Sequence, residues 1–281
     1  MINNLKTVLL LGGLTGLILF IGSLWGQTGM TIALVMSIIM NLGTYFFSEK
    51  LALMAYSAQP VSREEAPRLY AIVEALCSRA GIPMPKLYLI NDPSPNAFAT
   101  GRNPEHASVA VTTGALQILD ERELQGVLAH EISHIRNRDI LISSVAATLA
   151  GVITYLASMA QFAAIFGGLG RDRDDEGGGA LGGLFMIILA PIAALLIQMW
   201  ISRTREYQAD ASGADIMGDP QALASALQKL DNYSKRIPMQ AAPNTAHLFI
   251  VHPFSGSSVM SLFSTHPPIP KRIERLLGHS H

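Results

Sequence analysis

The chain alternates long apolar blocks with segments of mixed polarity. The first two blocks, Leu5–Leu24 and Met30–Phe47, contain a single charged residue, Lys6. A bilayer core about 30 Å thick needs roughly 20 helical residues, so each block is long enough to span it. The connection Trp25–Gly29 is short and uncharged. We therefore expect residues 1–48 to form an N-terminal transmembrane hairpin of two helices.

Two further apolar blocks occur at about 140–169 and 180–201, on either side of the acidic, glycine-rich segment 171–179. The third block contains several Ser and Thr residues, so either a tilted span or a helical hairpin packed against protein would fit it. The fourth contains Pro191, which a span tolerates where neighbouring groups satisfy the freed backbone. We expect both blocks to be transmembrane segments that interrupt a second domain over residues 49–281.

The segment between the second and third blocks has short helical and strand-like patterns. A capping box at Ser62–Glu65 precedes helically spaced apolar residues from Leu69 to Leu76. Strands are predicted at Lys86–Ile90 and Ser108–Thr112, with a turn-rich stretch over residues 91–100 between them. This part of the chain predicts a small β-sheet beside helices.

Three more helices are predicted from periodicity and end signals, over Glu121–Arg138, from Asp219-Pro220 onward, and over Pro270–Leu277. Taken together, the patterns predict a mainly α membrane protein, in which helical transmembrane segments accompany an α+β domain with a small β-sheet.

Composition supports a membrane protein and excludes two classes of site. Charged residues make up 15% of the chain, against about 25% in ordinary soluble proteins, and hydrophobic residues make up 49%. The net charge of −1 offers no basic field that would attract nucleic acid, so we expect no nucleic-acid partner. Cys77 is the only cysteine, which excludes a disulfide within the chain and a cysteine-rich zinc site. We expect Cys77 to be a small core residue.

Lys and Arg residues are distributed unevenly around the four apolar blocks. Residues 25–29 carry no charge, and residues 171–176 carry two Arg against four acidic residues. The other basic residues lie on the opposite side of the predicted spans. Because segments rich in Lys and Arg stay in the cytoplasm, we expect both termini and the second domain to face the cytoplasm.

One motif carries the strongest chemical signal. His130-Glu131-Ile132-Ser133-His134 reads H-E-x-x-H inside an uninterrupted helical pattern. Residues four apart share a helix face, so His130 and His134 can hold one zinc ion together. Glu131 can then act as a base on the attacking water.

A catalytic zinc usually takes a third protein ligand. If blocks three and four both cross the membrane, the segment after Ile201 returns to the face that holds the H-E-x-x-H helix. There Glu206 and Asp210 are four residues apart. We predict Glu206 as the third ligand and Asp210 as an acceptor that orients a ligand imidazole. The alternative is a solvated acidic pair beside Arg203 and Arg205.

These motifs, with the stretch Asn96–Gly101 and the closing Ser264–Pro268, resemble the HtpX family of membrane zinc metalloproteases. That family is of the gluzincin type and is related to the CAAX-processing Ste24 proteases. The resemblance implies a zincin-like domain with one Zn²⁺ per chain, in a multi-pass protein of the bacterial inner membrane with its active site facing the cytoplasm. It also implies protein or peptide substrates, among them misfolded membrane proteins cleaved under heat or envelope stress. No oligomeric state is indicated.

Two further roles are predicted for this site. His266, in the Thr-His-Pro-Pro motif, is the candidate donor to the oxyanion, with a loop-surface histidine as the alternative. His247 and His252 are weaker candidates. Asn96, Ala97 and Phe98 are candidates for a substrate cleft, where an extended edge could bind a peptide as an added strand. The alternative is an ordinary turn.

Two other functions remain open from the sequence. A specific processing protease of the Ste24 type would need a wider chamber than four spans provide. A non-catalytic membrane scaffold or holdase with a structural zinc would have no need of a base at Glu131, which favours an endopeptidase.

Overall fold

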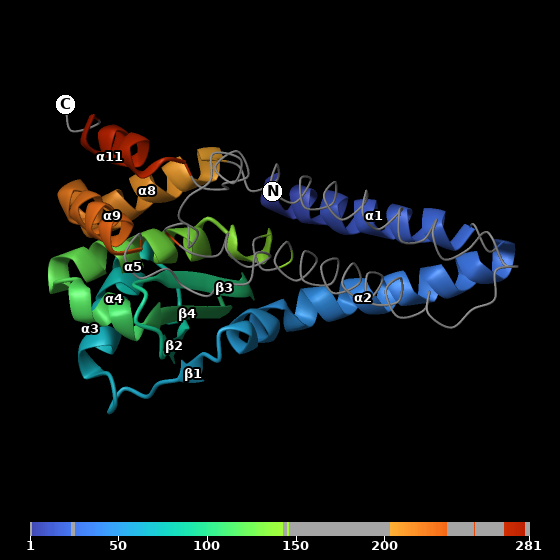
Figure 1. Ribbon diagram of the computed structural model, residues 1–281, viewed down its shortest axis with the longest axis horizontal. Helices are drawn as coiled ribbons and strands as arrows, with labels where there is room; N and C mark the ends of the chain where they lie inside the picture. The colour runs from blue at the N-terminus through green and yellow to red at the C-terminus, as the bar shows by residue number, and fades with distance from the viewer. Residues whose placement is uncertain are drawn as a thin grey trace, which may run out of the picture.

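The computed structural model describes residues 2–23, 26–142, 145, 203–234, 250 and 267–278. Two N-terminal helices, α1 (Ile2–Ser23) and α2 (Gly26–Ala55), pack side by side and extend away from the other elements (Figure 1). Asn41 Nδ2 on α2 donates a hydrogen bond of 2.8 Å to Thr15 Oγ1 on α1. Both N-terminal apolar blocks are therefore helical, as predicted, and α2 continues to Ala55.

Within the described residues, α2 is the one helix long and apolar enough to cross a membrane. Large apolar side chains along it are exposed, including Ile32, Ile39 and Phe47. The predicted spans at 140–169 and 180–201 lie outside the described residues, apart from 140–142 and 145. Membrane crossing by any of the four blocks stays a prediction.

The sheet has four strands in the order β1-β2-β4-β3. They are β1 (Gln59–Pro60), β2 (Lys86–Ile90), β3 (Ala97–Asn103) and β4 (His106–Thr112). β2 pairs parallel with β4, while β3 and β4 form an antiparallel hairpin. The prediction for β2 is confirmed, and β4 begins two residues before its predicted start.

The turn predicted over residues 91–100 is wrong in its last part, because β3 begins at Ala97. Phe98 stabilises this strand, because its ring is fully buried and its ring centroid lies 5.8 Å from that of Tyr56. The hairpin also depends on Gly101, whose φ is +135°. A Cβ at that position would come within 2.2 Å of the carbonyl oxygen of His106, so no other residue fits without a shift.

Helix α3 (Pro67–Ala80) begins later than the capping box predicts. Ser62 N–H donates to Glu65 Oε2 at 2.7 Å, and Glu65 N–H donates to Ser62 Oγ at 3.3 Å. These reciprocal bonds close a turn before the helix, not its first turn. The reason is Pro67, which disfavours α-helical dihedrals at Ala66, where φ is −134° and ψ is 58°.

Helix α5 (Glu121–Arg136) lies at the centre of the remaining elements, after the short α4 (Thr113–Ile118). Its capping box pairs Asp120 with Glu123. Helices α3, α8 (Arg203–Met217) and α9 (Pro220–Ser234) and strand β3 pack around it, and α11 (Ile269–Gly278) covers α8 and α9 (Figure 1). The predicted helices near Asp219-Pro220 and Pro270–Leu277 are confirmed. Cys77 is buried in the main core, as predicted.

Candidate metal centre

The two histidines of the H-E-x-x-H motif lie on one face of α5 and converge. His130 Nε2 and His134 Nε2 are 3.2 Å apart, and the rings meet at 90°. His130 is buried and His134 is half-buried. The spacing of four residues therefore brings both imidazoles to one point, as the helical period requires.

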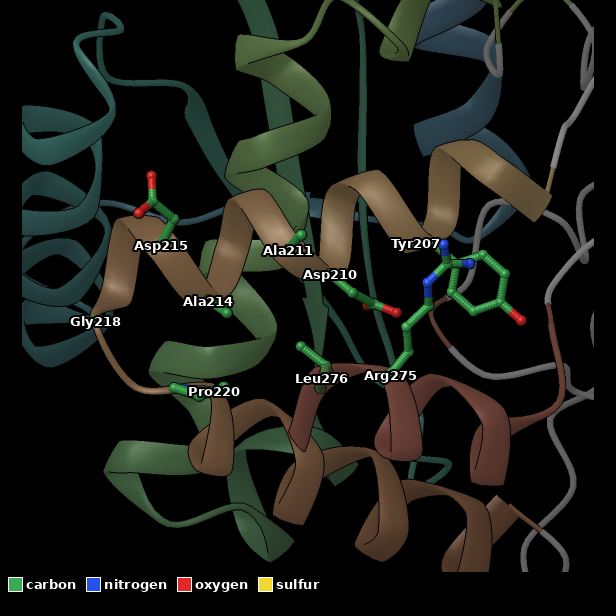
Figure 2. Close-up of a pocket in the computed structure, with 9 residues that line it drawn as sticks. All are labelled: Tyr207, Asp210, Ala211, Ala214, Asp215, Gly218, Pro220, Arg275 and Leu276. Carbon is green, nitrogen blue, oxygen red and sulfur yellow. The ribbon is translucent and has the colours of Figure 1, made fainter. Parts of the chain in front are cut away.

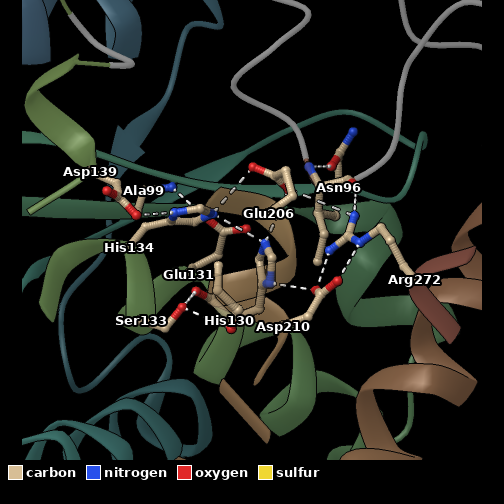
Figure 3. Close-up of polar contacts among 12 residues, drawn as sticks. Asn96, Ala99, His130, Glu131, Ser133, His134, Asp139, Glu206, Asp210 and Arg272 are labelled. Atoms are coloured by element: carbon tan, nitrogen blue, oxygen red, sulfur yellow. Dashed lines mark hydrogen bonds and ion pairs between the residues drawn. The ribbon is translucent and has the colours of Figure 1, made fainter. Parts of the chain in front are cut away.

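Helix α8 brings Glu206 to the same point. Its Oε2 is 3.7 Å from His130 Nε2, and its Oε1 is 3.7 Å from His134 Nε2. One ligand atom from each of the three residues lies within 4.8 Å of the others. These residues come from segments separated in the sequence by the third and fourth apolar blocks. Figure 3 shows the three side chains pointing toward one another.

Close contact between α5 and α8 makes this convergence geometrically possible. A Cβ at Gly213 of α8 would lie only 2.9 Å from the His130 backbone, so glycine lets the two helices touch. Ser133 Oγ donates to the carbonyl oxygens of His130, at 2.6 Å, and Ala209, at 3.1 Å. The hydroxyl therefore bridges the two helices directly beneath the site.

Asp210 contacts the second nitrogen of His130. Asp210 Oδ1 lies 3.0 Å from His130 Nδ1. Burial lowers the pKa of His130 to about 4, so the imidazole is neutral at pH 7. A neutral imidazole whose Nδ1–H faces a carboxylate leaves Nε2 free to bind a cation.

Arg272 of α11 holds Asp210 from the other side. Its Nε and Nη2 donate to the two Asp210 carboxylate oxygens at 2.9 and 2.6 Å, and its Nη1 donates to the carbonyl oxygen of Ile250 at 2.8 Å. Burial alone would raise the pKa of Asp210, but the charge and hydrogen bonds of Arg272 outweigh it and lower the pKa to about 2. Asp210 is therefore a fixed anion.

The seam between α8 and α11 is partly hollow beside this pair. A pocket of about 450 Å³ opens there, and Asp210 lies in its wall (Figure 2). Its other lining residues are Tyr207, Ala211, Ala214, Asp215, Gly218, Pro220, Arg275 and Leu276.

Asp139 contacts the other ligand histidine, and the sequence analysis missed it. Its Oδ2 lies 3.3 Å from His134 Nδ1. Burial opposes protonation of His134, but Asp139 and Glu206 outweigh it and raise the pKa to about 9. This cluster of carboxylates around two imidazoles has the electrostatics of a site built for a cation.

Glu131 lies against the edge of the sheet. Its Oε2 accepts a hydrogen bond of 2.9 Å from Ala99 N–H of β3 (Figure 3). Burial raises the pKa of Glu131 to about 8. A carboxyl group with such a pKa can take up and release a proton near neutral pH.

The residues predicted for the cleft lie at the start of β3 and are buried. Asn96 Oδ1 accepts hydrogen bonds from Ala97 N–H at 3.0 Å and from Ile250 N–H at 3.2 Å. The Phe98 side chain packs into a core cluster with Ala52 and Leu53. Peptide recognition here would therefore use the backbone edge. His266, His247 and His252 lie outside the described residues.

The donor set fits one metal ion. Two imidazole nitrogens and one carboxylate that converge within 4.8 Å match a catalytic zinc site of three protein ligands. The two flanking carboxylates, Asp210 and Asp139, match the acceptors that usually orient ligand histidines. His130, His134 and Glu206 are thus the residues that could hold the metal.

Comparison with known proteins agrees with this geometry. Peptidase family M48 matches residues 63–280. A protease HtpX homolog of Desulfatibacillum aliphaticivorans is 57% identical over 277 residues, which cover 98% of this chain and 89% of that protein. One from Persephonella marina is 56% identical over 279 residues, which cover 98% and 96%.

A solved structure shares the fold. The crystal structure of S. mikatae Ste24p matches with a TM-score of 0.55 at 19% identity, over 98% of this chain. The match spans 65% of the Ste24p chain. With the family match over most of its length, the chain belongs to peptidase family M48 and is a metalloprotease of the HtpX group.

Proposed function

We propose that this protein is a zinc-dependent endopeptidase of the bacterial inner membrane, which cleaves misfolded or damaged membrane proteins on the cytoplasmic side. The observation that supports it most is the convergence of His130, His134 and Glu206, with Glu131 held against the edge strand β3. When bound, zinc would polarise the scissile carbonyl and lower the pKa of the attacking water.

The side chains around the metal have separate tasks in this mechanism. Glu131, whose Oε2 is held by Ala99 N–H, takes the proton of the attacking water and passes it to the leaving amine. Asp210 and Asp139 lie 3.0 and 3.3 Å from the Nδ1 atoms of the two ligand histidines, and a carboxylate at that nitrogen favours the tautomer whose Nε2 can bind the metal. His266 is the proposed donor to the oxyanion.

Substrate recognition is proposed to use the backbone of β3. This strand is the last of the sheet within the described residues, and Ala99 N–H points away from β4 toward Glu131. An extended peptide added along this edge would be read mainly through its main chain. Recognition of that kind tolerates many sequences, as cleavage of misfolded chains requires.

Location in the membrane is supported by the N-terminal helices. α2 carries no charged residue from Gly26 to Ser48, and many of its apolar side chains are exposed. Apolar side chains in such number are stable against lipid but costly in water. The excess of Lys and Arg on the other side of the predicted spans supports a cytoplasmic active site.

The test separates the metal ligand from the base. Glu131→Gln keeps the three ligands, so it should retain about one zinc per chain and lose cleavage of casein. Glu206→Ala removes a ligand and should lose most of the zinc. Glu121→Gln, an exposed position on the same helix, is the matched control and should keep both. Full zinc in Glu206→Ala would place the third ligand elsewhere, and cleavage by Glu131→Gln would refute the mechanism.

A further inference from the structure

The membrane helix α2 is attached firmly to the catalytic sheet. Its last turns, at Ala52 and Leu53, pack in a buried cluster with Phe98 of β3 and Ala110 of β4. Because Phe98 is fully buried, this contact leaves little freedom between helix and strand.

Two polar contacts lie closer to the apolar part of α2. Glu49 Oε1 accepts a hydrogen bond of 2.7 Å from Ser108 Oγ of β4. Arg102, near the tip of the β3–β4 hairpin, lies over the Phe46 ring with its guanidinium carbon 5.4 Å from the centroid. The hairpin therefore contacts α2 where its uncharged stretch ends.

Residues 45–50 of α2 have the composition that is typical of a helix where it crosses the membrane surface. Tyr45, Phe46 and Phe47 are exposed, and Glu49 and Lys50 are the first charged residues of the helix. Aromatic residues followed by charges are typical of the boundary between lipid tails and headgroups. If α2 spans the bilayer, Arg102 lies at that boundary.

The catalytic carboxylate is only a short distance from this boundary. Glu131 is bonded to Ala99, three positions before Arg102 on the same strand. At about 3.3 Å per residue, three residues of strand cover at most about 10 Å. In Figure 1, β3 points toward α2, with the helices α3 and α9 on the far side of the sheet from it.

We propose that the catalytic centre is held close to the bilayer surface, so that it cuts membrane-anchored substrates within the first few residues beyond a transmembrane span. This inference rests on the proposed function, because it takes α2 to cross the membrane and Glu131 to be the base. Because Arg102 already lies at the inner edge of the headgroups, the path of at most about 10 Å from Arg102 to Ala99 includes the headgroup layer, which is about 5–7 Å thick. An extended substrate would cover this path with roughly three residues.

The experiment uses a substrate with sites at known distances from the membrane. A single-span anchor is followed by an unstructured tail with identical casein-derived sites at about 4, 14, 24 and 34 residues from the span. The full-length protein and this substrate are reconstituted together in vesicles, and the cut positions are mapped by mass spectrometry. The same tail without its anchor is the control for intrinsic site preference.

We expect the site nearest the anchor to be cut roughly tenfold faster than the site at 24 residues, because effective concentration is greatest where the tether matches the span. The anchor-free tail should be cut evenly, and Glu131→Gln should cut neither. Equal cutting of all anchored sites, or protection of the nearest, would overturn the inference while casein cleavage leaves the proposed function intact. Failure of the wild type to cut casein would overturn both.

Discussion

The buried pair of Arg272 and Asp210 offers the sharpest test of how the site is held together. Arg272→Met keeps much of the side-chain volume but leaves the Asp210 carboxylate buried without its guanidinium partner. Breaking a buried pair in this way typically costs roughly 3–5 kcal/mol. For domains of 150–250 residues, each kcal/mol lowers Tm by roughly 2–4 °C, so we expect a fall of roughly 6–20 °C.

The assay is thermal unfolding of chelator-treated protein in detergent, because bound metal would stabilise the fold by mass action and mask the effect. Lys271→Ala, an exposed position on the same helix, is the matched control and should change the free energy of unfolding by no more than about 0.5 kcal/mol. Arg272→Met combined with Asp210→Asn removes both charges and should recover part of the loss. If Arg272→Met unfolds at the same temperature as Lys271→Ala, the assignment of a stabilising pair is wrong.

Four other outcomes are expected. Asp139→Asn should weaken zinc binding roughly 10–100-fold, measured by competition with a chelating dye. Unchanged zinc affinity would show that Asp139 has no role in orienting His134. Burial alone would raise the pKa of Glu123, but hydrogen bonds from Lys229 and from the Asp120 N–H outweigh it and lower the pKa. The stabilisation that goes with this lowered pKa is present above the unfolded pKa of about 4.3 and is lost as pH falls below it. Glu123→Gln should therefore lose less stability than the wild type between about pH 6 and pH 3, as measured by thermal unfolding. His266→Ala should reduce cleavage roughly 10²–10³-fold at normal zinc content, and full activity would instead support the alternative that His266 is a loop-surface histidine without a catalytic role. A reporter fused after Gln59 should stay in the cytoplasm, and its export would contradict the orientation.

The convergence of the two histidines at the site was predictable because it follows from helix geometry. His130 and His134 share a face through their spacing alone. Glu206 has no such local signal, and it was reached only by assuming that two spans return the chain to one membrane face. The assumption led to a residue that the structure does place beside the histidines.

Asp139 and Arg272 were missed for different physical reasons. Asp139 follows the end of α5, where Arg138 adopts a φ of +59° and turns the chain back toward His134. Helical periodicity does not predict such a turn. Arg272 did leave a signal, because it falls on the apolar face of its helix with Ile269, Ile273 and Leu276. An arginine on a buried face needs a buried anion.

Two errors in the predicted fold have different physical causes, one local and one between residues far apart in the sequence. The Ser62–Glu65 capping box has the right local chemistry, but Pro67 moves the start of the helix. β3 was read partly as a turn because its flanks are rich in proline. The burial of Phe98 against α2, a contact between residues far apart in sequence, makes it a strand.

The place of Arg272 in the chain has a consequence for biosynthesis. It is 62 residues downstream of Asp210, and every other described residue of the site precedes it. At translation rates of roughly 5–20 residues per second, about 3–12 s pass between the synthesis of the two. During that interval a nascent chain has the histidines, the base, and Glu206 and Asp210 of α8, but not the cation that fixes Asp210. A newly made protease therefore reaches its final active-site geometry only late in its own synthesis.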